Sequence, residues 1–142
     1  MKEIELKLKE KNIVPTAMRL VVFDFLLQQT AALSLTDLEL GIGRTDRVTV
    51  YRTIRTFEEH GLVHRIDDGS GVTKFALCQQ NCTIDGHRDL HVHFYCIKCK
   101  ETHCLPKTHI PEVKLPLNYI AQETQLIVRG ICNQHMPTQA FV

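Results

Sequence analysis

A dense group of potential metal ligands, at residues 91–104, most constrains what this chain can fold into. The stretch HVHFYCIKCKETHC holds three histidines and three cysteines in fourteen residues. At its centre, Cys96 and Cys99 form a C-x-x-C pair, a spacing that lets two thiolates reach one metal ion. Cys132 and His135 form a C-x-x-H pair that offers the two further ligands a tetrahedral zinc site requires. The sequence therefore predicts a zinc site formed by both pairs.

Two histidines upstream of this pair indicate a second metal site. His91 and His93 alternate along a stretch that has the composition of a β-strand. Successive side chains of a strand point to opposite faces, so both imidazoles are expected on one face. That face could hold a second ion, because neutral imidazole is a common metal ligand.

The composition is that of a folded protein without a membrane partner. With 142 residues, 44% of them hydrophobic and 23% charged, the chain can form one ordinary domain or two small ones. No apolar run approaches the length of a membrane span, and the charged start MKEIELKLKEKN lacks the apolar core of a secretory signal. We therefore expect a cytoplasmic protein, in which the six cysteines are thiolates or metal ligands rather than disulfides.

Residues 1–78 have the order of a winged helix-turn-helix. Apolar residues recur at helical spacing after a short charged helix. The segment Thr36-Asp-Leu-Glu39 fits a capping box that opens a brief third helix, and Gly41-Ile-Gly43 is expected to end it. Two strand-like runs joined by the turn DDGSG then indicate a β-hairpin. We expect the other helices over residues 2–11, 17–29 and 46–60, and the strands over residues 62–66 and 72–77.

The last of these helices carries a basic outward face. Val50, Ile54 and Phe57 fall at i, i+4 and i+7 and form its inward stripe, while Tyr51 and several arginines are left outside. Such a face can be merely solvated, but its place after a short helix and a glycine turn favours contact with base edges and phosphates. The arginines of this basic patch are Arg44, Arg47, Arg52 and Arg55.

Beyond the hairpin the composition changes, which predicts a second domain. A polar stretch follows, and the strand-like segments after it have several prolines between Leu105 and Pro116. We therefore expect an α+β (α/β) chain with a winged-helix DNA-binding domain over residues 1–80 and a hinge over residues 81–90. A metal-binding domain over residues 91–142 would contain strands at residues 91–97, 101–105 and 119–132.

Taken together, these features resemble the ferric uptake regulator family of bacterial metal-responsive repressors. The resemblance covers nearly the whole chain, and its motifs are specific in combination rather than singly. The matching residues are Pro15-Thr16 with Arg19, the segment Thr49-Val-Tyr-Arg-Thr-Ile54, the helix exit Gly61-Leu-Val63, and His91 through Cys99.

The resemblance implies a homodimer that binds double-stranded operator DNA, with an N-terminal DNA-binding domain and a C-terminal α/β dimerisation domain. Tyr51 and Arg52 match recognition-helix positions that touch DNA in the family, and Arg19 matches a position near the phosphate backbone. The residues expected to contact DNA are Arg19, Arg44, Arg47, Thr49, Tyr51, Arg52 and Arg55.

The resemblance also bears on the structural zinc site, which in the family is commonly held by two C-x-x-C pairs. Cys96 and Cys99 match the first pair, but the second departs from the pattern and reads Cys132-Asn-Gln-His135. The spacing is unchanged and imidazole is an ordinary zinc ligand, so we expect a Cys3His site.

A sensory metal site is implied as well. The histidine and glutamate that the iron-type sites use are replaced here by Ala32 and Ala76. The zinc-sensing branch instead uses a histidine and a cysteine on the wing, a histidine before the C-x-x-C pair, and an acid after it, whose place Cys104 takes. Soft ligands favour zinc over Fe(II) or Mn(II). The expected sensory ligands are His64, Cys78, His93 and Cys104, with His91 as an alternate.

We therefore expect a zinc-responsive repressor, neither an enzyme nor a binder of small-molecule substrates. An iron-, manganese- or peroxide-responsive regulator of the same family, with Fe(II) or Mn(II) as the second metal, is the alternative. A thiol redox enzyme using Cys96 and Cys99 is a more remote one, because such pairs usually lie at a helix N-terminus in a βαβ context. No role is assigned to Cys82, His87 and His103.

Overall fold

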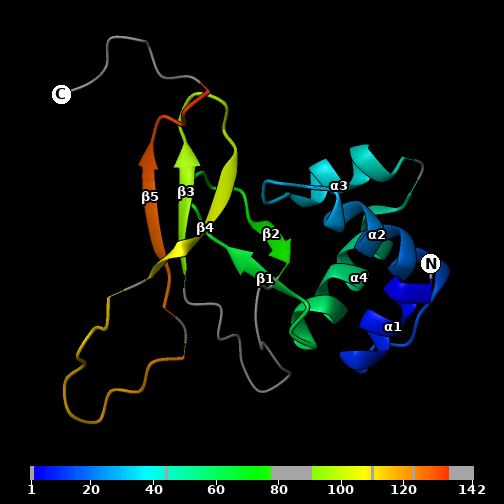
Figure 1. Ribbon diagram of the computed structural model, residues 1–142, viewed down its shortest axis with the longest axis horizontal. Coiled ribbons are helices and arrows are strands. Elements are labelled where there is room, and N and C mark those ends of the chain that lie inside the picture. Colours follow the sequence, from blue (N-terminus) through cyan, green and yellow to red (C-terminus); the bar gives the residue numbers. More distant parts are fainter. Residues whose placement is uncertain (1, 44, 78–90, 110, 123, 135–142) are drawn as a thin grey trace. The chain divides into compact units, whose positions relative to one another are not determined.

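Two compact units, Met1–Asp89 and Leu90–Val142, make up the chain. The computed structural model describes residues 2–43, 45–77, 91–109, 111–122 and 124–134 (Figure 1). The described residues of the first unit contain four helices and a β-hairpin, and those of the second contain three β-strands. The expected α+β fold class is thereby confirmed. None of the helices in these residues combines the length and the apolar character needed to cross a membrane.

Three of the four helices of the first unit begin at a polar capping residue. The hydroxyl of Thr16 accepts a hydrogen bond from the Arg19 N–H at 3.3 Å, and Asp46 caps the last helix in the same way. Gly61 ends that helix with a φ of 75°, a conformation that glycine adopts without strain. The four helices are α1 (Lys2–Glu10), α2 (Ala17–Leu27), α3 (Leu35–Ile42) and α4 (Arg47–Glu59).

The start of α3 differs from the expectation. The capping residue is Ser34 rather than Thr36, because the Ser34 hydroxyl accepts from the Asp37 N–H and the Asp37 carboxylate accepts from the Ser34 N–H. Gly41 does not end this helix but lies inside it, and Gly43 is the residue that follows its last turn. The expected capping box at residues 36–39 was therefore wrong by two residues.

One hydrophobic core holds the helices together. The expected inward stripe of α4 is confirmed, since Val50, Ile54 and Phe57 are buried. The rings of Phe23 and Phe57 meet edge to face, with centroids 6.2 Å apart. The buried members of this core are Leu8, Ile13, Val22, Phe23, Leu26, Leu38, Val50, Ile54, Phe57, Leu62, Val63 and Phe75.

The hairpin that follows α4 is anchored to the loop before α3. Strands β1 (Val63–Ile66) and β2 (Lys74–Leu77) pair antiparallel and are somewhat shorter than expected. Leu33 and Phe75 exchange two backbone hydrogen bonds, of 2.9 and 2.7 Å. These bonds hold the start of α3 beside β2.

In the second unit the three strands form one sheet with β3 in the middle (Figure 1). Strand β3 (His91–Cys96) pairs antiparallel with β4 (Thr102–His109) and parallel with β5 (Leu126–Gly130). Strand β4 continues past the expected residue 105, with an irregularity between His91 and Val92 on the partner strand. Strand β5 covers only residues 126–130 of the expected 119–132, because the strand that it pairs with, β3, is short.

Candidate functional site

Three cysteines from separate segments meet in the second unit. Cys96 ends β3, Cys99 lies in the turn that follows, and Cys132 comes shortly after β5. Their sulfur atoms lie within 4.8 Å of one another, and the Cys99 and Cys132 Sγ atoms are 3.9 Å apart. Two thiolates bound to one tetrahedral zinc ion at about 2.3 Å each are roughly 3.8 Å apart. The distance between the Cys99 and Cys132 sulfurs therefore matches the spacing that zinc requires.

The backbone around Cys96 brings these cysteines together. The Lys100 N–H donates to the Cys96 carbonyl at 2.9 Å, which closes the C-x-x-C turn, and Lys100 itself has a φ of 65°. The Ile97 N–H donates to the carbonyl of Gly130 at 2.8 Å. This last bond fixes the end of β5 beside the turn, so that Cys132 reaches the pair.

Backbone amides also prepare one sulfur for a metal. Burial alone would raise the pKa of the Cys96 thiol, but the N–H groups of Cys99, Cys132 and Lys98 outweigh it and lower the pKa to about 6. The first two lie 3.5 and 3.4 Å from the sulfur. At Cys99 the backbone N–H of Glu101 favours the thiolate, but burial and the neighbouring thiols prevail and raise the pKa. A divalent cation would favour ionisation of all three groups.

The fourth expected ligand, His135, lies outside the described residues. Sequence spacing alone places it three residues after Cys132.

A second pair of soft ligands lies across two strands of the same sheet. The register of β3 and β4 places His93 directly opposite Cys104. Side chains that face each other in this way lie on one face of the sheet, with Cβ atoms about 4.5–5.5 Å apart. His103 pairs with Phe94 on the other face, and its Nε2 atom is 3.2 Å from a Glu101 carboxylate oxygen. An imidazole and a thiol are thus presented together, with the neighbouring histidine turned away.

The other expected sensory ligands belong to different places in the chain. His64 lies on β1 of the first unit, where its backbone pairs with Ala76. His91 begins β3 and pairs with His109. Cys78 lies outside the described residues.

The outward face of α4 carries the residues expected to contact DNA. Tyr51, Arg52 and Arg55 are exposed on the side opposite the buried stripe. Arg55 donates to Glu59 at 3.1 Å and to the Tyr51 hydroxyl at 3.5 Å, which aligns both side chains along the helix.

Two other residues expected to contact DNA make hydrogen bonds within the protein. Thr49 donates its hydroxyl hydrogen to the Asp46 carboxylate at 3.0 Å, and this bond, with the Val48 N–H, lowers the pKa of Asp46. Arg19 donates to the carbonyl of Val14 at 2.8 Å. Arg44 lies outside the described residues.

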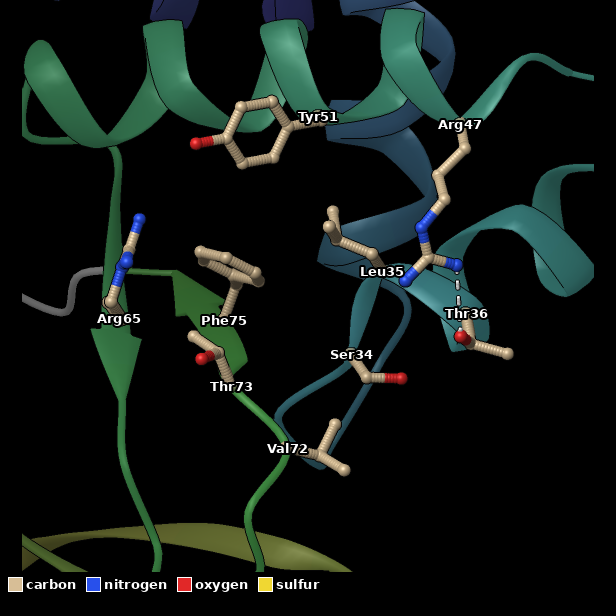
Figure 2. A pocket seen from close by; sticks show the side chains of 9 residues that line it. All are labelled: Ser34, Leu35, Thr36, Arg47, Tyr51, Arg65, Val72, Thr73 and Phe75. Carbon is tan, nitrogen blue, oxygen red and sulfur yellow. Dashed lines mark hydrogen bonds between the residues drawn. The ribbon is translucent and has the colours of Figure 1, made fainter.

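A pocket of about 250 Å³ opens between α3, α4 and the hairpin (Figure 2). Arg47 projects from α4 toward Thr36 and donates to its hydroxyl at 3.2 Å, while Arg65 projects from β1 on the other side. Arg65 and Thr73 were not among the expected functional residues, because the pocket exists only once Leu33 and Phe75 pair. The lining residues are Ser34, Leu35, Thr36, Arg47, Tyr51, Arg65, Val72, Thr73 and Phe75.

Comparison with solved structures identifies proteins of the same fold. A zinc uptake regulator complexed with zinc and DNA aligns with a TM-score of 0.64 at 19% identity, over 94% of this chain and 90% of that one. A zinc-bound manganese uptake regulator aligns with a TM-score of 0.62 at 16% identity, over 89% of this chain and 97% of that one. The Vibrio cholerae ferric uptake regulator aligns with a TM-score of 0.60 at 22% identity, over 90% of this chain and 98% of that one.

Comparison with curated proteins returns no match. The model of the ferric uptake regulator family, however, matches residues 11–126, which is most of the chain. The protein therefore belongs to the ferric uptake regulator family, whose members are metal-responsive transcription regulators and not enzymes.

Proposed function

We propose that this protein is a zinc-responsive repressor, which binds operator DNA as a homodimer when its sensory site holds zinc. The observation that carries the proposal is the placement of His93 opposite Cys104 in the β3–β4 register. Nitrogen and sulfur ligands favour zinc, whereas Fe(II) and Mn(II) suit sites with more oxygen ligands. The similarity of the fold to a zinc uptake regulator complexed with zinc and DNA supports the same interpretation.

The structural zinc in this proposal is held by Cys96, Cys99 and Cys132, with His135 as the fourth ligand. The sulfur spacing supports the first three members of the set. The second unit is small, with Leu90–Val142 as its bounds, and a unit of this size gains much of its stability from such a cross-link.

The sensory zinc is proposed to take ligands from both halves of the chain. His64 and Cys78 would come from the DNA-binding domain, residues 1–80, and His93 and Cys104 from the dimerisation domain, residues 91–142, with His91 as an alternate and residues 81–90 as the hinge. An ion shared in this way would restrict the orientation of one domain against the other. Because coupling between two sites is reciprocal, operator DNA must then tighten zinc binding by the same factor.

The DNA-reading surface in this proposal is the outward face of α4. Tyr51, Arg52 and Arg55 are exposed there and could reach base edges, and Arg47 at its start could reach a phosphate. Two such helices, one from each protomer, would read two half-sites.

An exposed apolar segment in the second unit supports self-association. Leu117 and Ile120 are 88% and 89% exposed, and Tyr119 and Val113 are also largely exposed. Contiguous exposed apolar side chains usually mark an interface. We propose that a second copy of the chain covers this segment in the homodimer.

The test combines metal analysis with DNA selection. Zinc-loaded protein should bind about two zinc ions per chain, and it should enrich a duplex from a random pool only when loaded. Cys104→Ser should lose one zinc and the zinc dependence of DNA binding. His103→Ala is the matched control, since it changes a histidine on the same strand that faces the other way.

Two results would contradict the proposal. One is a Cys104→Ser protein that keeps the full zinc content and zinc-dependent binding. The other is duplex enrichment by wild-type protein with Fe(II) or Mn(II) and not with zinc, which would favour the alternative regulator of the same family.

A further inference from the structure

We propose that the pocket between α3, α4 and the hairpin binds one sugar–phosphate unit of a DNA strand. The inference rests on the proposed DNA-binding function and deepens it, by assigning a backbone site that involves Arg65 and Thr73. Three features of the pocket support it: a polar rim, an apolar floor and a position beside α4.

Two arginines lie on opposite sides of the pocket (Figure 2). The Arg47 side chain is 57% exposed and lies 3.5 Å from a Glu39 oxygen, and that of Arg65 is 49% exposed and lies 3.2 Å from a Glu58 oxygen. Each carboxylate fixes its guanidinium and leaves much of it accessible. A fixed guanidinium binds phosphate well, because fewer rotamers are lost on binding.

The floor of the pocket is apolar. Phe75 is 3% exposed and stays in place under the Arg65 guanidinium, whose central carbon is 5.7 Å from the ring centroid. Leu35 and Val72 also line the pocket, together with the polar residues Ser34, Thr36 and Thr73. The carbons of a deoxyribose could pack on this apolar floor. The phosphates on either side of that sugar could then bind the two arginines and the hydroxyl groups of the rim.

The size of the pocket argues against a small-molecule effector. A volume of about 250 Å³ lies below the range of about 300–1,000 Å³ that is usual for drug-sized ligands. The site is open to the outward face of α4, since Tyr51 forms part of its wall (Figure 2). A short piece of a long polymer fits this shape better than an enclosed ligand does.

The place of the pocket in the fold identifies that polymer. In the proposed complex, α4 occupies the major groove and the hairpin lies beside the helix. The pocket lies between α4 and the hairpin, with Arg47 on one and Arg65 on the other, and we infer that the DNA strand bordering the groove passes there. The Leu33–Phe75 hydrogen bonds hold these walls together before DNA binds.

The test uses the zinc-loaded chain of 142 residues and a duplex selected from a random pool. Each phosphate is replaced in turn by an uncharged methylphosphonate. Arg65→Gln removes a charge from the pocket, and Thr73→Phe fills the pocket while both arginines remain. Thr73 is exposed, so its replacement should leave the fold and the melting temperature unchanged.

We expect both variants to bind the selected duplex about tenfold more weakly, the strength of one charge-assisted hydrogen bond. At one position in each half-site, replacing the phosphate by a methylphosphonate should weaken wild-type binding by a similar factor. The same replacement should not weaken the binding of either variant any further. Arg129→Gln is the matched control, because Arg129 also lies over an aromatic ring, 5.4 Å from the Tyr95 centroid, but belongs to the second unit.

Wild-type affinity in both pocket variants would overturn the inference and leave the proposed function standing. So would weakened variants that remain sensitive to the same methylphosphonate. If the wild-type protein enriches no duplex at all, the proposed function fails, and the inference fails with it.

Discussion

Replacing Gly41 with alanine should destabilise the first unit, although alanine is the better helix former. Gly41 lies in the last turn of α3, and the Phe25 ring of α2 packs directly on it. A Cβ atom built on Gly41 would lie 2.0 Å from Cζ of Phe25 and within 2.8 Å of two further ring carbons. Ordinary carbon contacts are about 3.5–4.0 Å, so the ring tip must move by roughly 1.5 Å.

The net effect follows from two opposing contributions. Alanine in a helix interior is favoured over glycine by up to about 1 kcal/mol. Forcing extra volume into a packed contact costs about 1–3 kcal/mol, and Phe25 packs against the buried core, which limits its retreat. Gly41→Ala should therefore lower the free energy of unfolding by about 1 kcal/mol, with about 2 kcal/mol as an upper value.

A double-mutant cycle in urea measures this directly. In the Phe25→Leu background the clashing ring atoms are gone, so Gly41→Ala should become neutral or stabilising. Gly43→Ala is the control: its φ of 99° strains any side chain while nothing lies within 4 Å of its Cβ position. Its cost should not depend on Phe25. An equal effect of Gly41→Ala in both backgrounds would refute the proposed clash with the ring.

Three further outcomes are expected. In zinc-free protein, thiolate absorbance at about 240 nm should rise near pH 6, and this transition should be missing in Cys96→Ser. The folded pKa of Cys96 is depressed, so its thiolate stabilises the folded state. That contribution is complete above the unfolded pKa of about 8.5 and is lost as the pH falls through about 6. A first transition near pH 8.5 would contradict this. Ser34→Ala should lower the free energy of unfolding by about 1 kcal/mol and Thr36→Ala much less; equal losses would contradict the capping assignment. Cys132→Ser should bind about one zinc fewer per chain and unfold at a lower temperature in calorimetry, whereas unchanged zinc content would exclude it as a ligand.

Features that depend on neighbouring residues could be predicted from the sequence. Helix α4 is the clearest case, because its buried stripe and its two ends are all encoded within it. Asp46 caps it and Gly61 follows it, and the bounds fall within a residue of those expected. The C-x-x-C turn is local in the same sense, so the spacing of Cys96 and Cys99 was enough to predict that they lie together.

Features that depend on distant pairing could not be predicted in this way. Two segments, Ser34–Asp37 and Thr36–Glu39, both fit a capping pattern. The pairing of Leu33 with Phe75 determines which of them starts the helix. The two hydrogen bonds of Phe75 with Leu33 keep the chain extended up to residue 33, so α3 begins directly afterwards. Strand β5 is limited in the same way, since its five residues pair one to one with residues 92–96 of β3.

The turn at residues 97–101 connects the two groups of potential metal ligands. The Cys96 N–H donates to the Glu101 carbonyl at 3.0 Å, and the register of the strands is then fixed. Counting outward from the turn, Tyr95 faces Thr102 and His93 faces Cys104. A shift of one residue would move Cys104 to the opposite face of the sheet and separate the imidazole from the thiol. The cysteine turn thus does more than hold its own ligands: it also sets the register that brings His93 and Cys104 together.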